Sequence, residues 1–98
     1  MALSDIDKKV LNDLIDHNIE DIRPVVEFAR NPECRGMLKE KDAFDFSLGF
    51  AIAEITGSFL TGFPKRNQRN TTKDDTDEMF RILGRRVGEI HEAIFKCG

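Results

Sequence analysis

The sequence predicts an all-α fold, a small bundle of four to five helices around one apolar helix. Apolar residues recur at spacings of three and four along most of the chain, without the alternation typical of strands. Residues 44–63 are apolar nearly all the way round, which is typical of a helix that other elements bury. Because 98 residues leave room for one core, residues 1–98 are predicted to form a single helical domain.

Helix start and stop signals place the first elements. A capping-box pattern that begins at Ser4 opens a helix over residues 5–17. Pro24 is tolerated only in the first turn of a helix, so the second helix is predicted to start with Asp21 as its N-cap. An Asn-Pro pair then starts a further short turn over residues 31–38.

The last two helices are predicted to form an antiparallel hairpin. The apolar helix covers residues 43–62, because Pro64 pushes the residue before it out of the helical conformation. A polar, basic loop follows over residues 64–72. A second capping pattern, either Thr72 with Asp75 or Asp75 with Glu78, opens the final helix over residues 73–96. The apolar stripe of that final helix consists of Met79, Phe80, Leu83, Val87, Ile90 and Ile94, the last five of which step by three and four as in a heptad seam.

Small residues recur at helical spacing in both long helices. Each glycine in a helix interior costs about 1 kcal/mol relative to alanine, and close approach of another helix would explain that cost. In a simple hairpin register Ala51 lies level with Gly84, and Ser47 lies level with Gly88. A second copy of the chain could pack on the other small residues of the apolar helix at the same time, or the first two helices could cover that face within one chain. The predicted core and interface residues are Phe44, Leu48, Gly49, Ala53, Gly57, Gly84 and Gly88.

A single carboxylate, Glu54, lies in the middle of the apolar helix. A buried glutamate without a partner would take up a proton or destabilise the fold. The hairpin register places Arg81 at the same level, so the sequence predicts a buried Glu54–Arg81 ion pair, with Arg85 or His91 as the substitute partner.

Composition bounds the class of protein. The net charge of −3 argues against a chain that binds nucleic acid over its whole surface. Cys34 and Cys97 form no disulfide framework, and the first residues lack a signal-peptide pattern, so we expect a cytoplasmic protein. Residues 46–64 meet the length test for a membrane span, but a mid-span Glu54 would be costly, and we expect no membrane association.

Cations gather in the predicted loop and in the final helix. Lys and Arg on one face can neutralise phosphates, which favours nucleic-acid or phosphate binding as one hypothesis. No aromatic residue interleaves these cations, so a stacking platform for single strands is absent, and a solvated loop is the simpler interpretation. The residues of this hypothesis are Lys65, Arg66, Arg69, Lys73, Arg85 and Arg86.

Catalysis and metal binding have little support in the sequence. Acidic residues gather around His17 and around His91, but without the spacing of zinc or carboxylate di-metal sites. No nucleophile elbow is present. We therefore expect no enzyme activity, no metal and no cofactor, and we assign no role to either histidine.

Two functional hypotheses remain, and no motif identifies a known family. The favoured one is association: a homodimer or larger homo-oligomer, or an adaptor for another protein, which would cover the apolar helix. The alternative is nucleic-acid or phosphate binding by the loop over residues 65–73 and the arginines of the final helix.

Overall fold

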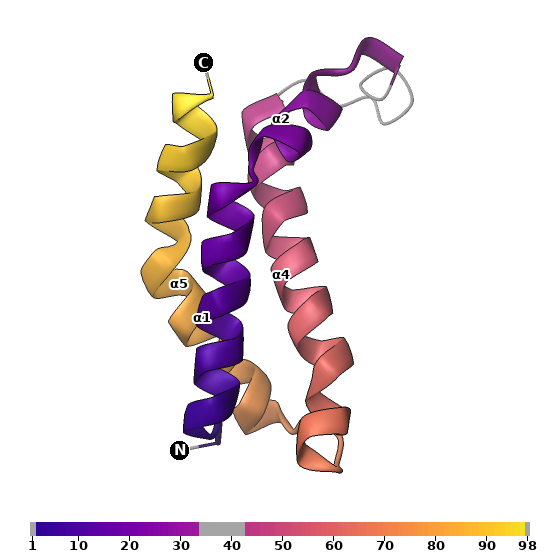
Figure 1. The fold of residues 1–98 in the computed structure, drawn as a ribbon, viewed down its shortest axis with the longest axis vertical. Coiled ribbons are helices and arrows are strands. Elements are labelled where there is room, and N and C mark those ends of the chain that lie inside the picture. Colours follow the sequence, from indigo (N-terminus) through magenta and orange to yellow (C-terminus); the bar gives the residue numbers. More distant parts are fainter. Residues whose placement is uncertain (1, 34–42, 98) are drawn as a thin grey trace.

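The computed structural model describes residues 2–33 and 43–97, and the prediction of an all-α fold is confirmed for them. These two ranges contain no strand and four helices (Figure 1). The predicted turn over residues 31–38 lies mostly outside the described residues. The helices are α1 (Asp5–Glu20), α2 (Arg23–Arg30), α4 (Ala43–Asn67) and α5 (Lys73–Lys96).

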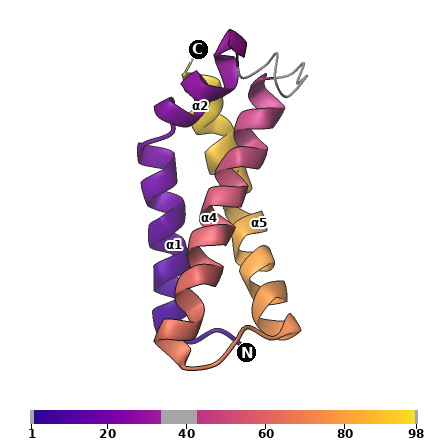
Figure 2. The same cartoon turned by 90° about the vertical axis from the view of Figure 1, so that its right-hand side faces the viewer.

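Three long helices lie side by side along the 42 Å axis of the molecule, and α2 packs at one end of them (Figures 1 and 2). The helix α4 contacts α1, α2 and α5, and α1 also contacts α5. The chain runs in one direction along α1 and α5 and in the opposite direction along α4, so the two described ends of the chain lie at opposite ends of the bundle (Figure 1).

The core lies between these helices. Phe59 and Phe63 on α4 are fully buried, and burial of one such ring stabilises a fold by roughly 1.5–3 kcal/mol. Phe44 and Leu48 are half-buried and pack against this core. The remaining members of the core include Leu11 and Ile15 on α1, Val26 on α2, Ala51 and Ile55 on α4, and Met79, Leu83, Ile90 and Ile94 on α5.

The predicted N-terminal caps of α1 and α5 are present, and the one at Thr72 is a complete capping box. The Ser4 hydroxyl accepts a hydrogen bond from the Asp7 backbone N–H at 3.1 Å. In α5 the Thr72 hydroxyl accepts from the Asp75 N–H at 3.3 Å, and the Asp75 carboxylate accepts from the Thr72 N–H at 2.7 Å. These bonds satisfy backbone donors that the first turn of a helix leaves free. The helix starts that local chemistry determines are therefore correctly predicted.

The predicted end of the apolar helix is wrong. The helix α4 continues through Pro64 to Asn67, so the connection to α5 is residues 68–72 rather than 64–72. Proline inside a helix costs about 3 kcal/mol, and side chains of the last turn offset that cost by binding α1, as described below. The helix ends where Gln68 takes a left-handed conformation (φ 55°) and its N–H donates to the Pro64 carbonyl at 2.7 Å.

Two other predicted boundaries also shift. The helix α1 runs on to Glu20, and Asp21 is its C-cap, with its N–H donating to the His17 carbonyl at 3.0 Å. Asp21 is therefore not the N-cap of α2, whose cap position is taken by Ile22 without a side-chain hydrogen bond. Pro24 lies in the first turn of α2 as predicted.

The predicted contact of small residues between the last two helices is wrong. Ser47 and Ala51 are fully buried, but Gly84 and Gly88 are exposed, and a Cβ added to either glycine would meet nothing within 4 Å. The reason is that α5 is rotated about its own axis relative to the predicted hairpin register. It buries Met79, while Phe80, predicted to be in the apolar stripe, is 56% exposed.

Candidate functional site

One end of the bundle is tied together by two buried carboxylates. Asp7 at the start of α1 is 2% exposed and accepts hydrogen bonds from Arg66 Nε at 2.9 Å and from Asn67 Nδ2 at 3.1 Å. Burial alone would raise the pKa of Asp7, but the hydrogen bonds from Arg66, Asn67 and Ser4 outweigh it and lower that pKa below its ordinary value.

Asp75 at the start of α5 is likewise buried and bound by an arginine. It is 1% exposed, and both of its carboxylate oxygens accept from the Arg69 guanidinium, at 2.7 and 3.2 Å. This bidentate pair is the main cause that lowers the pKa of Asp75 to about 2, against the opposing effect of burial. The Thr72 backbone N–H and hydroxyl add further hydrogen bonds to the carboxylate.

Aromatic rings complete this loop-end cluster, which we define as Asp7, Phe59, Phe63, Arg66, Asn67, Arg69 and Asp75. The guanidinium carbon of Arg66 lies 5.1 Å from the centroid of the Phe59 ring, and that of Arg69 lies 5.0 Å from the Phe63 ring. Such cation–π contacts add to the ion pairs. Both arginines therefore hold α1, α4 and α5 together.

The other members of the predicted nucleic-acid-binding set are dispersed. Lys73 Nζ lies 2.6 Å from an oxygen of Asp77, and Arg86 is bound by the carboxylates of Asp16 and Glu89. These two carboxylates raise the pKa of Arg86, with the Glu89 hydrogen bond as the largest cause. Lys65 and Arg85 are exposed and have no carboxylate at ion-pair distance among the described residues. Four of the six residues predicted to bind nucleic acid thus form ion pairs within the protein: Arg66, Arg69, Lys73 and Arg86.

The predicted buried pair of Glu54 and Arg81 is wrong. Both residues are exposed, and among the described residues Glu54 accepts a hydrogen bond only from the Asn18 side chain, at 3.5 Å. The buried stripe of α4 follows every fourth residue from Ser47 to Phe63, which leaves Glu54 at the edge of the helix toward α1. Among the other residues considered from the sequence, exposed His91 contacts the Phe44 ring at 4.5 Å, and His17 is exposed.

The middle of the side of α4 opposite its buried stripe carries no charge, and exposed Glu54 lies at its margin. We call this side the outward face; Figure 2 shows α4 in front of α1 and α5. A Cβ added to Gly49 or Gly57 would meet nothing within 4 Å, so open space lies above both. The outward face consists of five exposed residues, Gly49, Phe50, Ala53, Gly57 and Thr61, and four half-buried ones, Phe46, Thr56, Leu60 and Pro64.

Three phenylalanine rings gather at one end of the outward face. Phe28 on α2 lies 6.0 Å from Phe46 and 5.5 Å from Phe50, measured between ring centroids, and Phe46 lies 6.1 Å from Phe50. Phe28 remains 46% exposed and Phe50 36% exposed. The cluster therefore extends the apolar surface from α4 onto α2.

By length and composition, α4 is the one helix of the described residues that is apolar enough to cross a membrane. The core helix of a soluble protein, which is mostly buried, passes the same test of length and composition. In α4, however, only 28% of the most apolar 18-residue window is buried. This helix therefore carries more exposed apolar surface than a core helix requires.

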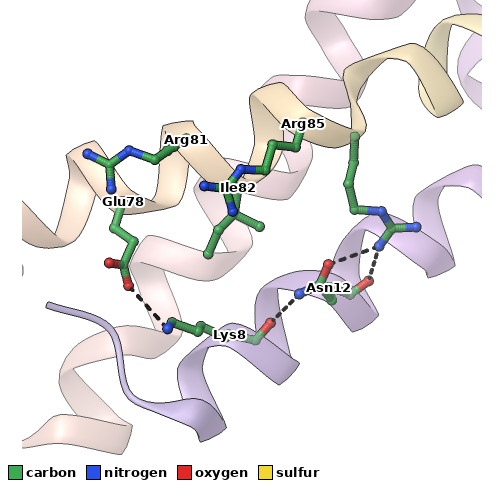
Figure 3. Close-up of a pocket in the computed structure, with 7 residues that line it drawn as sticks. Lys8, Asn12, Glu78, Arg81, Ile82 and Arg85 are labelled. Carbon is green, nitrogen blue, oxygen red and sulfur yellow. Dashed lines mark hydrogen bonds and ion pairs between the residues drawn. The ribbon is translucent and has the colours of Figure 1, made fainter. Parts of the chain in front are cut away.

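A cleft of about 420 Å³ lies between α1 and α5 (Figure 3). The sequence-based hypothesis included Arg85 and Arg86 but missed the residues that α1 contributes. Those residues are about 70 positions away along the chain, and no local signal identifies them. The lining residues are Lys8, Asn12, Glu78, Arg81, Ile82, Arg85 and Arg86.

The described residues contain no group of three His, Cys, Asp or Glu placed to hold a metal ion. Cys97, at the end of α5, is half-buried and free. Comparisons of this chain with protein-family models, with curated proteins and with solved structures found no match.

Proposed function

We propose that this chain is a small cytosolic protein that acts by association, and that the outward face of α4 binds a second copy of the chain. The observation that carries the proposal is the absence of charge on an exposed helix face from Phe46 to Pro64. At 1.5 Å per residue this face is about 27 Å long. Contiguous exposed apolar surface of this kind is typical of interaction sites.

The glycines support close approach by another helix. Gly49 and Gly57 lie in the interior of α4, where each costs about 1 kcal/mol relative to alanine. Nothing in the described chain approaches the space that a side chain would fill there. A second backbone packed against these positions would use that space and offset the cost.

The pattern on the outward face is self-complementary. If two copies of α4 pack antiparallel about a twofold axis at Ala53, Gly49 faces the partner's Gly57. The same axis places Phe46 opposite the partner's Leu60. Small residues thus meet at the centre, larger apolar residues meet toward the ends, and no charge lies on the axis. In this dimer α4 becomes the central helix, with its own chain on one side and the second copy on the other.

The area of the outward face determines the expected affinity of the dimer. A strip about 27 Å long and one helix diameter wide is on the order of 300 Å², well below the ~800 Å² per partner of a stable interface. Phe28 on α2 must therefore take part, and the dimer is expected to be concentration-dependent, with a dissociation constant of roughly micromolar order. No catalytic step and no cofactor is part of this proposal.

Solution mass tests the proposal. Light scattering or sedimentation over roughly 1 to 500 µM should show a shift from monomer to dimer that persists in high salt, because the contact is apolar. Ala53→Glu places a charge on the axis and should give a monomer at every concentration. Ile6→Glu is the matched control, because Ile6 is 70% exposed on α1 and lies off the outward face.

Three outcomes would overturn the dimer. One is a wild-type chain that stays monomeric at the highest concentration. Another is equal loss of mass in both variants, which would show that the acidic substitution acts nonspecifically. The third is a monomer that co-sediments with uncharged lipid vesicles, which would assign the outward face to a lipid surface.

A further inference from the structure

The cleft between α1 and α5 collects more positive charge than it neutralises. Figure 3 shows Lys8 and Asn12 on one wall and Arg81, Ile82 and Arg85 on the other. The described lining holds four cations, Lys8, Arg81, Arg85 and Arg86, and one carboxylate, that of Glu78.

Two of the four cations are already engaged. Lys8 Nζ lies 3.8 Å from an oxygen of Glu78, which also accepts from the Leu3 backbone N–H at 3.1 Å. Arg86 is held by the carboxylates of Asp16 and Glu89. The charges of Lys8 and Arg86 are therefore balanced within the protein.

Arg81 and Arg85 are not balanced. Both are exposed, and neither has a carboxylate at ion-pair distance among the described residues. Arg81 also lines a smaller hollow with Asp74, Asp77 and Glu78, none of which lies at ion-pair distance from it. Asp77 is paired with Lys73, and Glu78 with Lys8. Two like charges four residues apart on a helix repel each other, and these two lie on the wall of one cleft.

The remaining lining determines the shape of a ligand rather than its charge. Half-buried Ile82 gives the cleft an apolar wall between the two arginines. Asn12 donates to the Lys8 carbonyl at 2.9 Å and accepts from Arg86 at 3.1 Å, so its side chain is engaged within the protein. The volume of about 420 Å³ lies in the range of small-molecule sites.

We propose that this cleft binds a small phosphate monoester, with Arg81 and Arg85 on the phosphate and Ile82 against its carbon portion. A monoester carries close to two negative charges at neutral pH, which matches the two unbalanced arginines. Guanidinium groups donate forked hydrogen bonds that suit phosphate oxygens. This site is separate from the outward face of α4, so the test of phosphate binding does not depend on whether the chain forms the proposed dimer.

Phenyl phosphate, inorganic phosphate and phenol are suitable probes, followed by calorimetry and by NMR of the arginine side chains at low salt. Phenyl phosphate should bind, inorganic phosphate should bind more weakly, and phenol should not bind. Arg81→Gln and Arg85→Gln should each weaken phenyl phosphate about tenfold, because each removes a charge-assisted hydrogen-bonding group. Ile82→Ala should weaken phenyl phosphate and leave inorganic phosphate unchanged.

Lys65→Gln is the control, because Lys65 is an exposed cation outside the cleft and should not alter binding. Arg81 and Arg85 are exposed, so their glutamine variants should unfold at the wild-type temperature or slightly above it, as repulsion is relieved. If a glutamine variant loses its fold, Arg85→Lys keeps the charge without the fork and should still weaken binding.

The proposal is overturned if millimolar phenyl phosphate leaves the Arg81 and Arg85 signals unchanged, or if Lys65→Gln weakens binding as much as Arg85→Gln. A short DNA duplex is a further probe. If the duplex binds while phenyl phosphate does not, the arginines serve a nucleic-acid surface and the small-molecule site is wrong.

Discussion

The loop-end cluster and the outward face both use residues of α4, and their chemistry is opposite. In the cluster, Asp7 and Asp75 are buried and each is matched by an arginine that also lies over a phenylalanine ring. On the outward face no residue is charged, and Gly49 and Gly57 face open space. The loop-end cluster joins α1, α4 and α5, whereas the outward face leaves apolar surface exposed.

This contrast shows where polar residues stabilise a small domain. A surface ion pair contributes only about 0 to 1 kcal/mol, but a carboxylate buried at a helix N-terminus and bound by an arginine contributes more, because it also satisfies the cap. Arg66 and Arg69 join helix starts to a helix end that Pro64 would otherwise terminate early. A segment that looks like a solvated basic loop is therefore part of the fold.

The largest expected change in the free energy of unfolding distinguishes the buried side of α4 from its outward face. Phe59→Ala removes a fully buried ring and should lower the free energy of unfolding by about 3–5 kcal/mol. Phe50→Ala removes a ring from the outward face and should lower it by at most about 1 kcal/mol. Urea denaturation of both variants at low protein concentration measures the difference, and equal losses would contradict the assignment of the two sides.

The next effect tests the loop-end cluster. Asp75→Asn removes the charge that Arg69 binds and should destabilise the fold by about 2 kcal/mol. The matched control is Asp74→Asn, because Asp74 is an exposed acidic residue in the same first turn, where it interacts with the helix dipole but not with Arg69 at ion-pair distance. Similar losses in the two variants would mean that the dipole, and not the pair with Arg69, accounts for the effect.

The same carboxylate predicts how stability depends on pH. The ordinary pKa of Asp75 is 3.8 and Arg69 lowers it to about 2 in the fold, so its charged form stabilises the protein above about pH 4. That contribution is lost as the pH falls from 3.8 toward 2. Thermal denaturation should show wild type losing stability over this window, with a shallower slope in Asp75→Asn; an unchanged slope would show that Asp75 is not the titrating group.

The smallest expected changes in stability test whether the glycines of α4 and α5 face open space. Gly84→Ala and Gly57→Ala each add a methyl group to open space in a helix interior, so each should stabilise the monomer by about 0.5–1 kcal/mol. Only Gly57→Ala should also weaken the proposed dimer, because its methyl group separates the two α4 backbones. Denaturation at low concentration and solution mass at high concentration check the two parts. Destabilisation by Gly84→Ala would restore the predicted close packing of α5.

Features that depend on neighbours along the chain were predictable. The N-caps at Ser4 and Thr72 follow from residues three positions apart, and the all-α fold follows from apolar spacing within single helices. Of the core and interface residues predicted on α4, Phe44 and Leu48 are half-buried and pack against the core, whereas Gly49, Ala53 and Gly57 are exposed.

Partners across the bundle were not predictable. Asp7 meets Arg66 across 59 positions of sequence, and Asn12 meets Arg86 across 74. The predicted Glu54–Arg81 pair assumed that a mid-helix carboxylate is buried, but the rotation of α4 about its own axis leaves Glu54 in solvent. A hydrophobic pattern wide enough to cover the whole helix does not say which side faces inward.

The sequence by itself determined that this chain is helical and where most helices begin, because helix propensity, capping and apolar spacing act within four residues. The tertiary structure alone decided that α4 passes through Pro64, which arginines are engaged in the fold, and that Arg81 and Arg85 share a cleft with Lys8. Those outcomes depend on the rotation and packing of whole helices, which bring charges together from distant parts of the chain.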